Sequence, residues 1–390
     1  MRHLKNLAMG LVAVSLLAAC GGGGDGNQTP KIKFTSMVNF GDSLSDVGTY
    51  KVGTVAALGG GKWTVNSATA KNWTEVLAAQ LGVSAPCPAV TGLNGTAAAG
   101  FSVTPVSNPA CKNYAQGGSR VTHPIGPGNA TLDALSGTSP SVGALTYPIS
   151  TQITNHLASV NGTFAGTELV TVQAGANDLF MQFSVFSVLQ TVNPSQQATI
   201  DNFRNYATMI AGWSNADVDS VLGSGANATS AAATVMIAKM GAAGLDLSNL
   251  VKTQIVAKGS KYTLVLNVPN VSRTPFANGL NNAVLTSVIA GMTTAFNSAL
   301  QTGLTGTAGV KFGDAYVTNT DQFNNPAQYG ITNITTPACG TTSSLICTAA
   351  TTGALDYSTY LFADGVHPTP YGYKLIAQEA AKHLVIAGWL

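Results

Sequence analysis

Residues 34–44 read FTSMVNFGDSL, and this stretch decides how the rest of the chain is interpreted. Phe34–Phe40 is an apolar run with the length of a buried β-strand, and a Gly-Asp-Ser-Leu turn ending at Leu44 follows it. A strand holds the backbone still, while the turn after it lifts the hydroxyl of Ser43 out of the packed sheet. A Gly/Asp/Ser cluster after a strand is equally often a plain turn. Ser43 is therefore a candidate nucleophile only if the chain also supplies a base, an orienting acid and oxyanion donors.

Strand-like and helix-like stretches alternate along the rest of the chain. The predicted strands are Lys33–Phe40, Leu169–Gln173, Tyr262–Val268 and Val310–Val317. The predicted helices are Ala70–Leu81, Ser195–Ile210, Ala231–Ile255, Asn281–Leu300 and Tyr371–Ala387. This alternation predicts an α/β fold whose mostly parallel sheet is covered by helices on both faces. No linker interrupts residues 32–390, so we expect one domain, with the loops at 84–112 and 318–362 as insertions over the site.

The N-terminus has the pattern of an export signal. Two basic residues precede the apolar run Leu7–Leu17, and small residues lead to Cys20. This arrangement resembles a bacterial lipoprotein signal, which implies cleavage after residue 19 and a lipid on Cys20. Residues 20–31 would then be a Gly-rich tether, and the protein an exported lipoprotein of the outer membrane, the periplasmic side or the cell surface. The alternative is an ordinary secretory signal in which Cys20 has no role.

Composition excludes several classes of partner. Removing the leader lowers Lys+Arg from 18 to 16 against 16 Asp+Glu, so the net charge of the remainder is about zero. No basic field is left to attract nucleic acid or anionic lipid. Only 9% of residues are charged, and 45% are apolar, which is ample for a large core.

Four further cysteines suggest disulfides rather than a metal site. In an oxidising compartment an even number of cysteines favours two bridges, with three possible connectivities. We expect neighbours to pair, because both neighbouring pairs lie in Gly/Pro/Thr-rich loops: Cys87 with Cys111, and Cys339 with Cys347. A zinc site is disfavoured, since no pair has close spacing and no histidine is near, and nothing in the sequence calls for a cofactor.

Two blocks offer oxyanion donors. Residues 113–119 read NYAQGGS, in which a glycine either shapes a turn or brings its N–H to a ligand. Asn177 follows the strand Leu169–Gln173, at the edge where open α/β sheets place their sites, and its amide can donate to an oxyanion. Asn177 could instead cap the next helix, but Asp178 is suited to that task and would leave Asn177 free.

Residues 362–369 read FADGVHPT and contain the candidate base. Asp364 precedes His367 by three residues in a tight turn, a spacing that places a carboxylate against the imidazole and fixes its tautomer. The other histidines after the leader lack this context. His123 lies in a Gly/Pro loop, and His156 and His383 are predicted to be helical packing or surface residues.

Taken together, the four blocks resemble the GDSL, or SGNH, hydrolase family, in the family's order across residues 40–369. The resemblance implies Ser43 as nucleophile, His367 as base and Asp364 as its orienting acid. It implies an oxyanion hole made by the N–H groups of Ser43 and Gly117 and the amide of Asn177. It further implies a three-layer α/β/α, flavodoxin-like fold and serine-dependent hydrolysis of carboxylic esters. An α/β-hydrolase is disfavoured because Gly41–Ser45 lacks the second glycine of G-x-S-x-G.

The segment VPNVSRTP, residues 268–275, resembles the bacterial branch with phospholipases, hemolysin-like lipases and choline esterases. A choline ester would need an aromatic cage, for which Trp63, Trp73 and Tyr114 are available. The expected substrate is a small-molecule or lipid ester of unassigned acyl chain. Two other functions stay open: an acyltransferase that uses the same acyl-enzyme, and a surface lipoprotein that binds a partner without catalysis.

Overall fold

Across the described residues, 32–353 and 355–390, the computed structural model contains a four-stranded parallel sheet. Its strands, in spatial order, are β1 (Met37–Gly41), β4 (Leu169–Gln173), β5 (Thr263–Leu266) and β6 (Val310–Gly313). The predicted leader, tether and Cys20 lie outside the described residues. Lys33–Leu390 forms one compact unit.

An extended segment, residues 112–116, continues the sheet beyond β1. The N–H of Asn39 donates to Lys112 O at 3.0 Å, and the N–H groups of Tyr114 and Gln116 donate to Asn39 O and Gly41 O at 2.8 and 3.1 Å. The pairing is parallel. The spatial order is therefore residues 112–116, β1, β4, β5 and β6. This is the strand order of a flavodoxin-like sheet, in which the second strand of the sequence lies at the edge, next to the first. The predicted α/β fold with a parallel sheet is confirmed.

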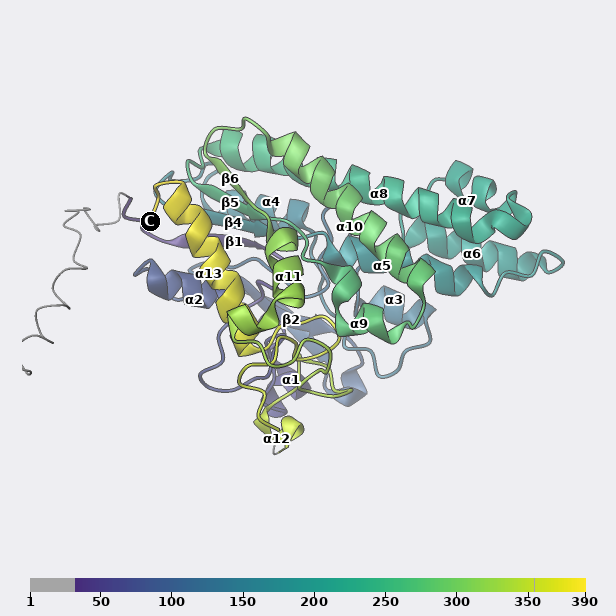
Figure 1. Ribbon diagram of the computed structural model, residues 1–390, viewed down its shortest axis with the longest axis horizontal. Helices are drawn as coiled ribbons and strands as arrows, with labels where there is room; N and C mark the ends of the chain where they lie inside the picture. Colours follow the sequence, from purple (N-terminus) through teal and green to yellow (C-terminus); the bar gives the residue numbers. More distant parts are fainter. Residues whose placement is uncertain (1–31, 354) are drawn as a thin grey trace, which may run out of the picture. The chain divides into compact units, whose positions relative to one another are not determined.

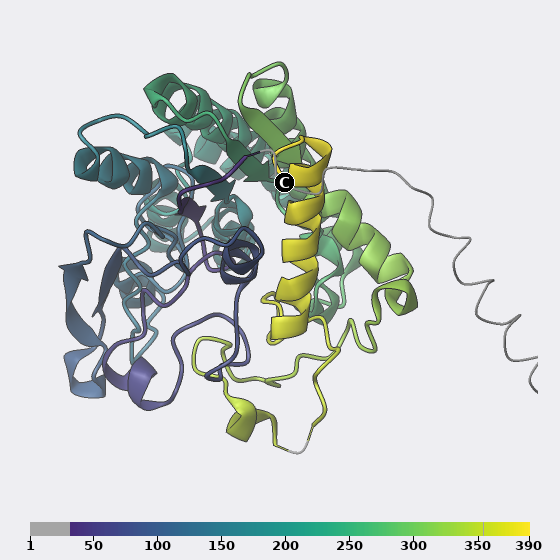
Figure 2. The ribbon, with the colours of Figure 1, turned by 90° about the vertical axis from the view of Figure 1, so that its left-hand side faces the viewer.

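Helices cover both faces of the sheet. One face packs on α4 (Ile149–Ser159), α8 (Ala228–Leu250) and α10 (Ala283–Leu304), whose apolar side chains join those of the strands in one core cluster. The other face is covered by α2 (Trp73–Gln80) and α13 (Pro370–Ile386), which pack against each other. Figures 1 and 2 show α13 on the opposite side of the sheet from α4 and α8. In β1, Val38 and Phe40 belong to the first core, as alternation along a strand requires.

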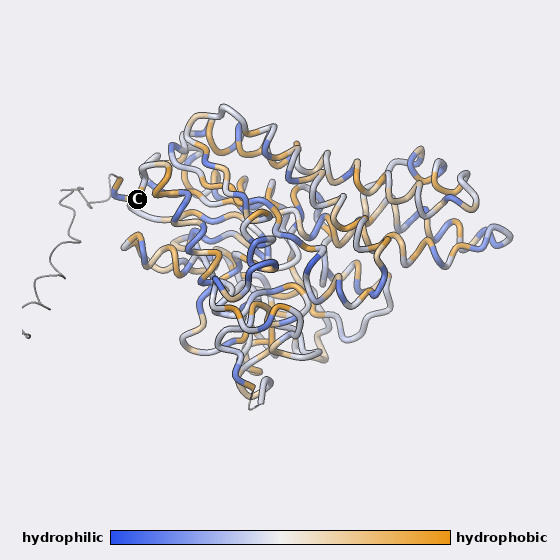
Figure 3. Tube along the Cα trace, in the orientation of Figure 1, coloured by the Kyte–Doolittle hydropathy of each residue, from blue (hydrophilic) through white to orange (hydrophobic). Residues whose placement is uncertain are grey.

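The remaining helices are shorter or project from the sheet. They are α1 (Gly53–Ala57), α3 (Ala130–Leu135), α5 (Ala176–Leu189), α6 (Gln197–Met209), α7 (Asn215–Leu222), α9 (Pro275–Gly279), α11 (Ala315–Asn324) and α12 (Ala349–Thr352). In Figure 1, α6, α7 and the first turns of α8 extend away from the strands. Figure 3 shows apolar and polar residues interleaved along α8 and α10. Gly225–Lys258 and Ala283–Leu304 are long and apolar enough to cross a membrane, but core helices pass the same test.

Several predicted boundaries differ from the structure. β1 begins at Met37 rather than Lys33, and the loop expected at 318–362 contains the end of α11 and all of α12. The strand expected over Val310–Val317 ends at Gly313, because the Asp314 side chain accepts from the N–H of Val317 and starts α11. The loop expected at 84–112 contains an antiparallel hairpin, β2 (Val90–Asn94) and β3 (Ser102–Ser107), with an irregular register. Both disulfides join neighbours, as expected: Cys87 with Cys111, and Cys339 with Cys347.

Candidate active site

Ser43 lies two residues beyond the end of β1, where the backbone is fixed by α4. The side-chain amide of Gln152 accepts from the N–H of Gly41 at 2.9 Å and donates to its carbonyl at 2.8 Å. A Cβ on Gly41 would come within 2.8 Å of Gln173 O on β4, so only glycine fits this close approach. The Asp42 carboxylate then accepts from the N–H of Leu44 at 3.0 Å and turns the chain.

The predicted base and orienting acid lie directly beside Ser43. His367 Nε2 is 2.8 Å from Ser43 Oγ, and His367 Nδ1 is 2.8 Å from Asp364 Oδ2. Nδ1 therefore donates to the carboxylate, which leaves Nε2 as the acceptor for the serine proton. The Asp364 carboxylate also accepts from the N–H of His367 at 2.8 Å and from that of Val366 at 3.0 Å. Three of the sequence-predicted residues thus form one hydrogen-bonded chain.

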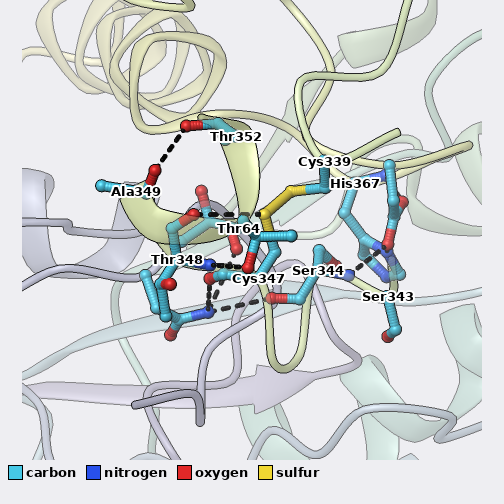
Figure 4. Close-up of a disulfide and its surroundings, with 12 residues drawn as sticks. Thr64, Cys339, Ser343, Ser344, Cys347, Thr348, Ala349, Thr352 and His367 are labelled. Carbon is cyan, nitrogen blue, oxygen red and sulfur yellow. Dashed lines mark hydrogen bonds and ion pairs between the residues drawn. A yellow bond between two sulfur atoms is a disulfide. The ribbon is translucent and has the colours of Figure 1, made fainter. Parts of the chain in front are cut away.

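The short disulfide loop between Cys339 and Cys347 supplies a further donor to the acid. The N–H of Ser344, a residue of this loop, donates to Asp364 Oδ2 at 3.1 Å. Figure 4 shows Ser344 near His367, which lies outside the loop. Burial alone would raise the pKa of the Asp364 carboxyl. Attraction to His367 and the hydrogen bonds from His367 and Ser344 outweigh burial and hold this pKa well below its usual range. Asp364 therefore stays ionised and can stabilise a protonated His367.

Asn177 lies in the first turn of α5, after β4. Its Nδ2 donates to Ser119 O at 2.9 Å, which ties it to the second block and leaves its other N–H free within the described residues. Asp178 does not cap the helix, contrary to expectation. It forms a buried ion pair with Arg120 Nε at 3.1 Å and accepts from the N–H of Val121 at 3.0 Å.

The expectation for Gly117 requires a correction. Its N–H donates to the buried carboxylate of Asp46 at 3.0 Å, so it is not free to bind an oxyanion. The next residue, Gly118, has a φ of +83° and an N–H without a partner among the described residues. The N–H of Ser43 is unpartnered in the same sense. The second block therefore offers its free amide at Gly118.

Known proteins with the same motifs can now be compared. The family model for GDSL-like Lipase/Acylhydrolase matches residues 37–380. The chain belongs to this family. A GDSL esterase/lipase of Arabidopsis thaliana is 36% identical over 78 residues, which cover 19% of this chain and 21% of that protein. The match thus spans about a fifth of the plant protein's length.

One solved structure aligns with most of the chain. The extracellular lipase of Streptomyces rimosus has 16% identity, with coverage of 90% of this chain and 99% of the lipase. The TM-score is 0.36, too low to support any detail of the fold.

An apolar cavity opens at the GDSL serine. It has about 950 Å³ of empty space, adjoining open solvent included, and its lining contains Ser43, His367 and Asn177. Apolar side chains from several elements form most of the remaining wall, among them Phe180 and Leu266. The hydroxyl of Ser43, the imidazole of His367 and the amide of Asn177 therefore all face a mostly apolar pocket.

The three aromatic residues considered for a choline cage do not line this cavity. Trp73 is fully buried and donates to Ser45 Oγ at 3.1 Å, and Tyr114 packs on Phe40 in the main core. Trp63 lies against His367, with ring centroids 4.8 Å apart and planes inclined by 32°. The described residues therefore give no support to a choline cage at the cavity.

Three contributors to this GDSL site could not be found from the sequence. Gln152 fixes Gly41 from α4, Ser344 donates to Asp364, and Trp63 covers His367. None lies in the four motif blocks, and each reaches the site through tertiary packing. Asp46 lies three residues after Ser43, so the sequence places it near the site. The hydrogen bond that its carboxylate accepts from the Gly117 N–H depends on the fold and could not be predicted.

Proposed function

We propose that this chain hydrolyses carboxylic acyl esters through an acyl-enzyme on Ser43. The observation that carries the proposal is the hydrogen-bonded chain from Asp364 through His367 to Ser43 Oγ in the wall of a mostly apolar cavity. Membership of a lipase and acylhydrolase family supports the same class of substrate. This combination of nucleophile, oriented base and free amide donors is typical of acyl transfer.

In the first half-reaction, His367 Nε2 accepts the proton from Ser43 Oγ as Oγ attacks the acyl carbon. The carbonyl electron pair moves to oxygen, and the oxyanion receives hydrogen bonds from the amide of Asn177 and the N–H groups of Ser43 and Gly118. Each such donor typically stabilises the transition state by about 3–4 kcal/mol. The C–O bond of the ester then breaks, and His367 gives the proton to the leaving alcohol. Water releases the acyl group by the same steps in reverse.

A fluorophosphonate probe tests the nucleophile directly. We expect labelling of folded protein, with the adduct mapped to Ser43, and loss of both labelling and ester hydrolysis in Ser43→Ala. Hydrolysis that persists in Ser43→Ala would refute the mechanism. Folded protein that hydrolyses no ester and takes no probe would favour the binding function instead.

The oxyanion hole has its own kinetic signature. Asn177→Ala should lower kcat by on the order of 10²–10³ with little change in KM, because the donor acts mainly in the transition state.

Product analysis with added glycerol separates hydrolysis from acyl transfer, since an acyltransferase would form the glycerol ester in place of free acid.

We also propose that residues 32–390 form the catalytic domain of an exported lipoprotein, cleaved after residue 19. Support comes from the leader pattern before Cys20 and from two disulfides, which suit an oxidising compartment. Mass spectrometry of the mature N-terminus should find a lipidated Cys20, and Cys20→Ser should move the protein from the membrane fraction to the soluble fraction. An unmodified Cys20 in membrane-associated protein would contradict this proposal.

A further inference from the structure

The cavity at Ser43 runs across the carboxyl edge of the sheet. Its lining includes one residue or more after each strand: Ser43 after β1, Asn177 after β4, Pro269 after β5 and Ala315 after β6. Because the strands are ordered β1-β4-β5-β6, the cavity crosses three inter-strand spacings. At about 4.8 Å each, this is a path of roughly 14 Å from the nucleophile to the start of α11.

Two helices form the outer wall of this path. On α11 the lining residues are spaced like one helix face, from Ala315 to Gln322, and on α13 they run from Gly372 to Glu379. Seven residues of helix cover about 10 Å, so each wall extends for about two turns. Among the described lining residues none is Lys or Arg, so the cavity offers a phosphate group no permanently charged cation. Most of the remaining lining residues are apolar, although α11 contributes the polar side chains of Thr318, Asn319 and Gln322. A hydrocarbon chain would pack against the apolar residues.

Among the α13 residues that line the cavity, Glu379 is the one furthest along the helix from His367. Glu379 Oε1 is 2.9 Å from His383 Nε2, and a Cβ on Gly313, the last residue of β6, would lie 3.0 Å from the His383 ring. The close approach of His383 lowers the pKa of Glu379, so this group stays charged. A methyl group that reached Glu379 would remove water from a charged group without replacing its hydrogen bonds, which is unfavourable. An apolar chain in the cavity would therefore be expected to stop short of Glu379.

We infer that this cavity is the acyl-chain subsite, that it takes straight medium-length chains, and that Ala315 and Glu379 set the upper limit of chain length. The inference rests on the proposed ester hydrolysis. An extended chain advances about 1.3 Å per carbon, so a path of 10–14 Å holds roughly eight to eleven carbons. The acyl group is assigned to the cavity because it stays bound to Ser43 while water enters, whereas the alcohol must leave.

The test is the chain-length profile of kcat/KM for p-nitrophenyl esters from acetate to palmitate, which share one leaving group. We expect a maximum at roughly eight to eleven carbons and a fall beyond twelve. Ala315→Leu fills the end of the path and should lower the decanoate-to-butyrate ratio by roughly tenfold. Glu379→Gln keeps the shape but removes the charge, and should raise the tetradecanoate-to-decanoate ratio by a similar factor. Val317→Leu, on the exposed side of α11, is the matched control and should leave the profile unchanged.

The outcomes separate the two proposals. If hydrolysis persists in Ser43→Ala, the proposed function fails. If hydrolysis needs Ser43 but neither Ala315→Leu nor Glu379→Gln moves the profile in folded protein, the subsite inference fails alone. A profile that responds to the length of the alcohol in a series of alkyl acetates, and not to the acyl chain, would place the alcohol in the cavity and also overturn the inference.

Discussion

Replacing Trp63 by leucine should change how the reaction depends on pH. The indole of Trp63 lies against the imidazole of His367, with ring centroids 4.8 Å apart. During catalysis His367 becomes positively charged, and the face of an indole attracts a cation within about 6 Å of its centre. Leucine keeps the site covered from water but has no aromatic face. The expected effect is therefore a less stable imidazolium.

The size of the effect follows from the geometry. A cation over an aromatic face gains about 0.5 kcal/mol when exposed and about 2 kcal/mol when desolvated. One pH unit corresponds to about 1.4 kcal/mol, so losing the indole should shift a titration midpoint by about 0.4–1.5 units. A destabilised imidazolium loses its proton more readily. The acid limb of kcat/KM in Trp63→Leu should therefore move to lower pH by that amount.

The assay is kcat/KM for a soluble ester from pH 4 to 9, with Trp63→Phe as the matched control because it keeps an aromatic face. We expect the midpoint of the acid limb in Trp63→Phe to stay close to the wild-type pH. The midpoint in Trp63→Leu should move to lower pH. Equal midpoints in all three proteins, with activity lowered uniformly, would show that Trp63 only fills space. A shift of the leucine variant to higher pH would mean that water reaches the imidazole.

Three further predictions concern two buried carboxyl groups of the site and the disulfide beside them. Burial raises the pKa of Asp42 to about 7 from the usual 3.8. The contribution of its protonated form to folding stability is therefore complete below pH 3.8 and is lost as the pH rises through 7. Asp42→Asn should thus raise the free energy of unfolding by about 2–4 kcal/mol at pH 8, with little difference at pH 4, as denaturant titrations at the two pH values would reveal. Asp364→Asn should lower kcat by on the order of 10³–10⁴ in pre-steady-state assays, because an amide neither fixes the tautomer nor stabilises the imidazolium; a loss below tenfold would argue against its role. Replacing Cys339 and Cys347 by alanine should cost about 2–3 kcal/mol of stability by thermal unfolding and lower kcat, because it loosens the Ser344 N–H that holds Asp364; an unchanged kcat in folded protein would contradict this.

Much of the site is predictable from the sequence because its chemistry is local. Asp364 and His367 are three residues apart in one turn, and Ser43 follows an apolar strand directly. Their assembly needs only a parallel sheet, whose strands end at one edge. Gln152 could not be predicted in the same way. Its contact with Gly41 depends on how α4 packs against the sheet, and a polar residue in a helix has no local pattern that identifies such a contact.

The choice between Gly117 and Gly118 was also beyond the sequence, and it shows why the motif needs two glycines. Both lie in one turn, and each has an N–H that could approach a ligand. The two glycines differ in their surroundings in the folded protein. A Cβ on Gly117 would lie 2.4 Å from the indole of Trp63, while Gly118 adopts a φ of +83°. Gly117 thus makes room for the ring that covers His367 and gives its N–H to Asp46. Gly118 turns the backbone, and its N–H has no partner among residues 32–353 and 355–390. Replacing Gly117 by alanine should therefore act through the imidazole and move the acid limb of the pH profile, an effect that loss of an oxyanion donor would not produce.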